Sequence, residues 1–390
     1  MKANTLGKGK EAIRRENLSA LLRKVHTEGT VSRAALGETL GLSKTTIAEL
    51  VAELEVAGLV LRVGTEQSGS AGRPSQLVAA SKEPLVLVVN PEIDGQTLAF
   101  VNFAAEISEL EFTEFDMAYS LETTVSLIKR FLDAHADIWR GRLQGVVVAV
   151  PGAVDRISGE LIDAPSLGWR DLDIATQINA ALGLDVWVTN NARSATVSEH
   201  LFGAAKGLKN AICLFSGVGG IGGGFVVNGL VLEGSNGIAG EIGKMNLRTE
   251  NIRKPKTFGE LMRREDIVAA LGKSRLSDEA LDSLMEQSNE FEVNTVIDAQ
   301  VALLLAAVET LRDLFDPEAV ILGGYLGSLV KSRKTQMLKD LNHNSLKVRG
   351  ADFLIPRAAE LKPMVLIGAA ETAWQGILND PTNRKAKNAN

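Results

Sequence analysis

The chain has 390 residues, 45% of them hydrophobic, which is enough to fill the cores of two or three domains. Its single cysteine, Cys213, excludes an intramolecular disulfide framework and any zinc site built from several cysteines. The formal net charge of −6 is unevenly spread, because residues 1–75 carry 11 Lys and Arg against 8 Glu, a net of +3 on an otherwise acidic chain. This asymmetry indicates that only the N-terminal part approaches a polyanion, although so small an excess can also arise by chance.

Residues 10–80 show the spacing of a winged helix-turn-helix. Apolar residues at helical intervals predict a first helix over 10–27. Ser32 is a suitable N-cap for a short second helix, and Ser43 for a third helix that runs to about residue 57. The third helix would bury Ile47, Leu50, Val51 and Leu54. Its N-terminal residues Lys44, Thr45 and Thr46 then lie where helix-turn-helix proteins usually contact bases or nearby phosphates.

Two short strands are predicted next, over 59–63 and 76–79, with a polar, glycine-rich wing between them. Arg73 lies in the wing between a glycine and a proline, and it suits entry into a narrow minor groove. Arg33, at the start of the second helix, suits a contact with the DNA backbone. The segment is therefore predicted to bind double-stranded DNA. The alternatives are a solvated loop in place of the wing and a three-helix module that contacts proteins.

Beyond residue 83, short apolar strands alternate with helices, which is typical of an α/β domain. The cycle restarts near residue 211 and suggests two lobes of similar design around a cleft. Helices are predicted over 123–139, 171–182, 195–202 and 295–315, and strands over 85–89, 97–103, 146–150, 186–189, 211–215, 224–227 and 319–322. The glycine-rich run 216–224 could place backbone amides around a phosphate, but a tight hairpin is the favoured interpretation. None of the four histidines shows metal-ligand spacing, and His26, on a polar helix face, is expected to be a surface or satisfied residue.

Motifs over nearly the whole chain point to one family. They are Ser32-Arg33-Ala34-Ala35-Leu36, Gly41-Leu42-Ser43-Lys44-Thr45-Thr46, Gly72-Arg73-Pro74, Val150-Pro151-Gly152, Gly168-Trp169, Asn190 with Ala192, residues 219–224, Gly240-Glu241-Ile242-Gly243, Ile321-Leu322-Gly323-Gly324 and Gly368-Ala369-Ala370. The chain resembles the ROK family (repressors, open reading frames and kinases) in its winged-helix regulator branch. The resemblance implies an actin/hexokinase-like fold, a duplicated ribonuclease-H-like domain in two lobes, over 83–378. A polar tail over 379–390 would follow it.

Departures from the family's kinase pattern are as informative. Kinases of the family carry an Asp-x-Gly-Gly-Thr phosphate loop, whereas residues 90–97 read Asn-Pro-Glu-Ile-Asp-Gly-Gln-Thr. The catalytic Asp is replaced by Asn191, and an amide cannot accept a proton from a sugar hydroxyl as a carboxylate does. The Glu-x-Gly-His motif becomes Glu241-Ile242-Gly243-Lys244, and the cysteine-rich zinc loop is replaced by residues 251–259, so no zinc is expected. Ser166 stands where an Asn usually precedes Gly-Trp.

The resemblance and its departures predict a sequence-specific transcription regulator, a repressor of carbohydrate-related genes, with an inactive kinase-like body and no cofactor. A sugar or sugar derivative would bind the interlobe cleft, with Asn190, Asn191, Glu241, Lys244 and Ser166 as the candidate contacts. Lys244 could bind an acidic sugar or a sugar phosphate, or only replace the positive charge of the zinc. The body could also have lost its ligand and serve only to dimerise.

A homodimer or homotetramer is expected, because helix-turn-helix proteins usually read two half-sites. The polar N-terminus is no signal peptide, and the uninterrupted apolar stretches are short, which predicts a cytoplasmic protein without membrane contact. The competing interpretation is an ATP-dependent sugar kinase with a fused DNA-binding domain.

Overall fold

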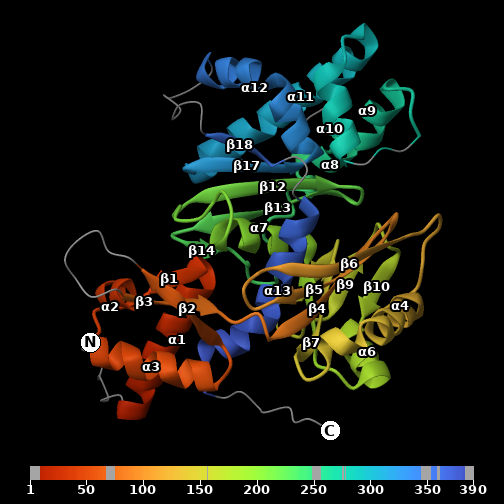
Figure 1. The fold of residues 1–390 in the computed structure, drawn as a ribbon. Coiled ribbons are helices and arrows are strands. Elements are labelled where there is room, and N and C mark those ends of the chain that lie inside the picture. The colour runs from red at the N-terminus through yellow and green to blue at the C-terminus, as the bar shows by residue number, and fades with distance from the viewer. Residues whose placement is uncertain are drawn as a thin grey trace, which may run out of the picture.

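The computed structural model describes residues 9–66, 75–155, 157–247, 256–274, 276, 278–343, 353–357 and 361–382. They form a small N-terminal domain and two lobes, each built on a five-stranded sheet. In Figure 1 the last helix, α13 (Leu361–Asn379), passes from the junction of the lobes to the N-terminal domain. Segments from the two ends of the chain thus lie side by side.

The N-terminal domain has three helices and a three-stranded sheet in the order expected of a winged helix-turn-helix, while residues 67–74 of the predicted wing lie outside the described residues. Its helices are α1 (Lys10–Glu28), α2 (Arg33–Leu40) and α3 (Lys44–Val56), and its sheet has the order β1 (Thr30–Ser32), β3 (Ser75–Ala80) and β2 (Val60–Glu66). Both predicted caps are present. The Ser32 hydroxyl accepts a hydrogen bond from the Ala35 amide at 3.3 Å, and the Ser43 hydroxyl accepts one from the Thr46 amide at 3.1 Å. The Ser43 cap, together with Gly41 in the left-handed conformation at the end of α2, sets the tight turn between α2 and α3.

The sheet of the first lobe has the order β11-β7-β4-β5-β6. Three antiparallel strands come first in the chain and two parallel strands follow: β4 (Leu85–Glu92), β5 (Gly95–Asn102), β6 (Ile107–Glu114), β7 (Leu143–Val150) and β11 (Val186–Asn190). One face packs against α4 (Leu121–Ala134) and α6 (Ile174–Leu182), and the other packs against α13. Both faces of β4 and β5 are therefore buried, which explains their continuous apolar sequence.

The second lobe repeats this plan with the order β14-β13-β12-β17-β18. Its strands are β12 (Ala211–Gly217), β13 (Gly220–Val227), β14 (Leu230–Val231), β17 (Ala319–Gly324) and β18 (Leu354–Arg357). Numbered along the chain within each lobe, both sheets have the order 3-2-1-4-5, so the predicted duplication is confirmed. The second lobe also contains the helices α8 (Phe258–Leu261), α9 (Arg264–Ala270), α10 (Asp278–Gln287), α11 (Phe291–Phe315) and α12 (Tyr325–His343).

Two small sheets and one more helix complete the cleft region. A sheet of order β10-β9-β8 comprises β8 (Ala153–Val154), β9 (Leu161–Ala164) and β10 (Trp169–Leu172). The strands β15 (Asn246–Leu247) and β16 (Lys256–Thr257) pair beside a 3₁₀ turn, η1 (Ile242–Lys244). Helix α7 (Asn191–Leu201) starts where β11 ends and packs against β13 and α13.

Three predicted helices have different bounds in the structure. The helix predicted over 123–139 is divided at His135 into α4 and α5 (Ala136–Trp139). The one predicted from residue 171 begins after Asp173, because residues 169–172 form β10 and the Asp173 carboxylate caps α6 by accepting the Thr176 amide at 2.9 Å. The one predicted from residue 195 is α7, which begins at Asn191.

Among the described helices, α11 is the one whose length and composition would allow it to cross a membrane. One stripe of α11 is buried in the second lobe, with Ile297, Leu304 and Val308 fully enclosed. It packs against α9 and α12. This pattern is that of a core helix.

Candidate ligand cleft and nucleic-acid interface

A cavity of about 430 Å³ lies between the two lobes. It is lined from the first lobe by the loop after β7 and by β9, from the second lobe by the β12–β13 hairpin and η1, and by the start of α7. All five candidate residues named from the sequence lie in its wall: Ser166, Asn190, Asn191, Glu241 and Lys244. Segments up to 78 residues apart are brought together because both sheets direct their strand ends to this gap.

The side-chain amide of Asn190 makes two hydrogen bonds within the protein. Its Oδ1 accepts the Arg193 amide at 2.8 Å and caps α7, while its Nδ2 donates to the Gly152 carbonyl at 2.8 Å. One N–H and one lone pair remain for a ligand. Asn190 thus fixes the loop after β7 against the start of α7, and Asn191 follows as the first residue of that helix.

Glu241 and Lys244 form an ion pair at the other side of the cavity, with 3.1 Å between Lys244 Nζ and Glu241 Oε2. The Lys244 side chain is 64% exposed, and an exposed pair of this kind contributes at most about 1 kcal/mol. A ligand can therefore separate the two at small cost. Ser166 offers a hydroxyl directly, since its Oγ is buried and has no hydrogen-bond partner among the described groups.

The cavity is also lined by three acidic residues that were not among the candidates from the sequence: Glu92, Asp163 and Glu260. Asp163 accepts from Arg170 Nε at 3.2 Å. Glu260 accepts from the amide and hydroxyl of Thr257, and these bonds lower its pKa. Together with Glu241 they give four carboxylates in the described wall. Lys244 pairs with Glu241 and Arg170 with Asp163, so an acidic excess remains that disfavours an anionic occupant.

The segment that replaces the phosphate loop forms a closed hairpin. Glu92 pairs with Gly95 across a turn at Ile93 and Asp94. The Tyr119 hydroxyl lies 2.8 Å from the carbonyl oxygens of both Glu92 and Gly95, which share its single hydrogen. Burial raises the pKa of this phenol, so it remains a donor at neutral pH. No run of glycine amides faces the cleft here, in contrast to a phosphate-binding loop.

The glycine-rich run 216–224 is a β-hairpin, as favoured from the sequence. The strands β12 and β13 pair from Ala211–Val226 to Gly217–Gly220. A Cβ at Gly222 would lie 2.6 Å from the Ala192 Cβ, and one at Gly224 would lie 2.3 Å from Thr196 Oγ1. These glycines are therefore needed so that β13 can pack closely on α7.

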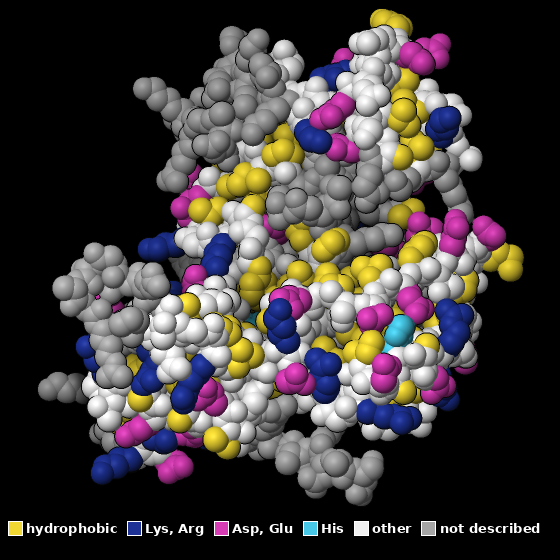
Figure 2. Space-filling view, viewed as in Figure 1, with side chains coloured by type: hydrophobic (Ala, Val, Ile, Leu, Met, Phe, Trp, Pro, Cys, Tyr) yellow, Lys and Arg dark blue, Asp and Glu magenta, His cyan; other side chains and the backbone are white. Residues whose placement is uncertain are grey.

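Four of the five candidate DNA contacts lie at the starts of α2 and α3. Lys44 and Thr45 are exposed at the start of α3, and Thr46 Oγ1 lies 2.9 Å from the Ser43 hydroxyl. Arg33 is half-buried and donates to Gln76 of β3 at 3.3 Å, which ties the start of α2 to the wing strand. Arg73 lies outside the described residues. Figure 2 shows Lys and Arg side chains over this domain mixed with Asp and Glu.

Known proteins resemble the chain along most of its length. The ROK family matches residues 95–370. A xylose repressor of Bacillus spizizenii is 28% identical over 60% of this chain and 61% of its own length. A glucokinase of Halalkalibacterium halodurans is 29% identical over 60% of this chain and 79% of its own length.

Among solved structures, a ROK family transcriptional regulator described as a homologue of the E. coli MLC protein aligns with a TM-score of 0.67. It is 20% identical, and the alignment covers 93% of this chain and 98% of that structure, so this likeness concerns the fold. The family match spans well over half of the sequence and includes all of the second lobe's strands and, except for β4, those of the first lobe. The chain therefore belongs to the ROK family.

Proposed function

We propose that the protein is a sequence-specific DNA-binding regulator, a repressor of carbohydrate-related genes, with a body that senses a small molecule. One observation carries the proposal. An N-terminal domain of winged-helix layout, with Lys44 and Thr45 exposed at the start of α3, is packed onto a ROK body in the same chain. The similarity to a xylose repressor supports it.

DNA binding is tested by selecting fragments of the host genome with the purified protein and measuring affinity at a fixed salt concentration. We expect Lys44→Ala combined with Arg73→Ala to weaken the specific complex at least tenfold, since each lost base contact costs about 1–3 kcal/mol. Lys129→Ala is the matched control, because it removes an exposed charge from the body. An unchanged complex in the double variant would show that these residues do not read DNA.

The body has no sugar-kinase activity under this proposal. Asn191 cannot serve as a general base, which alone costs roughly 10²–10⁴ in rate. The closed β4–β5 hairpin offers no cradle for a phosphate, and Glu92 adds a negative charge to the cavity. The glucokinase relative keeps the alternative of an ATP-dependent sugar kinase open to test. Turnover of any hexose or N-acetylhexosamine with ATP in a coupled assay would establish that alternative.

The charge of the cavity narrows the ligand class. Four carboxylates, of which Lys244 and Arg170 pair with two, favour a neutral or amine-bearing sugar over a sugar acid or a sugar phosphate. The hydroxyl of Ser166, the amide of Asn191 and the carboxylate of Glu241 supply the donors and acceptors that sugar hydroxyls need. A volume of about 430 Å³ lies within the range usual for small-molecule sites. Lys244 then serves to orient Glu241 more than to attract an anion.

Ligand binding is tested by a thermal-shift screen over neutral sugars, amino sugars, sugar acids and sugar phosphates. A true ligand at a hundredfold excess over Kd stabilises the protein by about 2.7 kcal/mol. We expect the gain from a neutral or amino sugar to be lost in Glu241→Ala and retained in Lys129→Ala. Equal stabilisation of wild type and Glu241→Ala would place the ligand elsewhere. To act as an effector, the ligand must also bind the DNA-competent and DNA-incompetent states with different affinities.

A further inference from the structure

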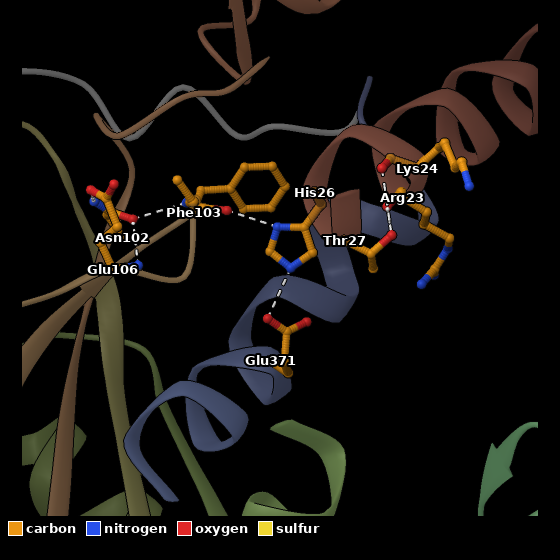
Figure 3. Close-up of polar contacts among 9 residues, drawn as sticks. Arg23, Lys24, His26, Thr27, Asn102, Phe103, Glu106 and Glu371 are labelled. Carbon is orange, nitrogen blue, oxygen red and sulfur yellow. Dashed lines mark hydrogen bonds and ion pairs between the residues drawn. The ribbon is translucent and has the colours of Figure 1, made fainter. Parts of the chain in front are cut away.

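The contact between the N-terminal domain and the body contains a buried polar pair. His26 of α1 lies with its Nε2 2.9 Å from Glu371 Oε1 of α13, and its Nδ1 lies 2.7 Å from the carbonyl oxygen of Phe103. The His26 and Glu371 side chains are 1% and 3% exposed. Figure 3 shows the imidazole between the carbonyl and the carboxylate. Phe103 also stacks on the ring, with 4.4 Å between centroids.

The hydrogen bonds determine the orientation of the ring. A carbonyl oxygen can only accept, so His26 Nδ1 donates to Phe103. Nε2 then either donates to a Glu371 carboxylate or accepts from a protonated Glu371. Both arrangements hold the ring between the same two partners. Buried pairs of this type contribute little net stability compared with apolar packing, but removal of one partner is costly because the other is left unsatisfied.

The other polar contacts across this boundary are more exposed. Ser19 donates to the Leu378 carbonyl, and Lys206 reaches both the Thr27 carbonyl and Glu28. Arg15 pairs with Asp380, and Arg23 contacts Asn379. Contacts of exposed ionic side chains contribute little to the preference for one geometry. His26 and Glu371 are therefore the buried polar anchor between the domains.

Helix α13 carries this anchor into the wall of the ligand cavity. Val365 lines the cavity, and Glu371 follows six residues later, about 9 Å along the same helix. Between them, Gly368 lies so close to the Ser194 carbonyl of α7 that a Cβ would overlap it. The helix that begins at Asn191 in the cavity is thus packed without a gap on the helix that holds His26.

We propose that His26 and Glu371 are positioning residues for DNA recognition. They fix the angle at which the winged helix stands on the body, so that an oligomer presents its α3 helices at one separation. The proposal rests on the proposed function and adds to it the residues that set half-site spacing. Loss of the anchor keeps the apolar cluster that joins the N-terminal domain to α13, but it removes the buried directional contact and so widens the range of orientations.

The test compares three DNA duplexes bound by each variant: the selected operator, a single half-site, and the operator with about 5 base pairs inserted between half-sites. The insertion moves one half-site to the opposite face of the duplex, since a turn is about 10 base pairs. Wild type should bind the selected operator best and lose most affinity on the insertion. Glu371→Leu should bind the selected operator at least about tenfold more weakly than wild type. Once one N-terminal domain is bound, the effective concentration of the second subunit's N-terminal domain at the other half-site falls. Its affinity for the single half-site should stay within about twofold of wild type, and its penalty for the insertion should shrink.

Two variants serve as controls. Glu371→Gln should restore wild-type spacing preference, since its amide can still donate to His26 Nε2. Gln375→Leu, an exposed position one turn along α13, should behave as wild type. A Glu371→Leu protein that keeps the sharp spacing preference, or loses equal affinity on all three duplexes, would overturn the proposal.

A second measurement needs no DNA. Spin labels at Lys44→Cys and Lys129→Cys report the distance between the reading helix and the body, and the native Cys213 is buried. We expect a narrow distribution of distances in wild type and Glu371→Gln and a broad one in Glu371→Leu. A distribution that stays narrow in Glu371→Leu refutes the proposal. If wild type selects no DNA sequence while the broadening occurs, the anchor stands and the proposed function fails.

Discussion

The two lobes share one topology but close their first hairpins by different means. In the first lobe the β4–β5 hairpin carries polar side chains and is held by the Tyr119 hydroxyl. In the second lobe the β12–β13 hairpin carries glycines that let α7 approach the strand. The first hairpin carries no run of glycines at its turn, whereas the second carries the glycines that let it pack on α7 beside the cavity. Catalytic and ligand-binding geometry can therefore diverge separately within a duplicated fold.

The largest effect on the free energy of unfolding should follow from adding a side chain at Gly224 in the β12–β13 hairpin. Gly224→Val places side-chain atoms against Thr196, which is fully buried and cannot move away. Overpacking of this kind costs about 1–3 kcal/mol and can cost more, and here we expect the upper end. Urea unfolding monitored by circular dichroism measures the change. Gly376→Ala, where a Cβ meets no atom within 4 Å, should cost nothing. A Gly224→Val protein of wild-type stability would show that α7 can be displaced.

A smaller effect should follow from Tyr119→Phe in the first hairpin. The carbonyl oxygens of Glu92 and Gly95 lose their shared donor, which should cost about 1 kcal/mol of unfolding free energy. Because burial raises the Tyr119 pKa, this contribution is present at neutral pH and is lost as pH rises above the ordinary tyrosine value of about 10. Denaturant titrations at pH 7 and above pH 10 measure both quantities. Equal stability of the two proteins at pH 7 would mean that the phenol does not hold the turn.

The smallest effect on activity is expected from Asn191→Asp. This change restores the carboxylate that kinases of the family carry, but the β4–β5 hairpin still provides no phosphate cradle. We expect no turnover of ATP with any hexose in a coupled assay. Measurable turnover would show that the first hairpin is not what prevents catalysis, and that one atom separates this chain from an enzyme.

The fold was predictable where local signals are strong. Ser32 and Ser43 cap their helices as the sequence indicates, and the restart of strands near residue 211 marks the second lobe. The strand β1 was missed because it has only three residues and pairs with β3, which follows 43 residues after its end. The start of α7 was placed four residues late, since Asn190 was assigned to a ligand and not to a helix cap.

The cavity was predictable only from motifs. The residues that the family resemblance indicated line it, whereas Asp163 and Glu260 enter the wall through the packing of β9 and α8, which no local pattern reveals. His26 illustrates the same limit. Its position on a polar helix face is consistent with a satisfied residue, which the structure shows, but it is buried because α13 covers it. Contacts between the ends of a chain leave no local trace in the sequence.

The joining of the first and last helices also has a consequence for biosynthesis. Ser19 and its partner Leu378 are 359 residues apart, so the winged helix leaves the ribosome long before the helix that receives it. At a synthesis rate of about 5–20 residues per second, this delay is roughly 20–70 s. The apolar core of the N-terminal domain is continuous with that of α13, so this core stays incomplete until α13 has been made. Only a chain translated through α13 can therefore form the contact between His26 and Glu371, and a fragment that ends earlier lacks the partner of its first helix.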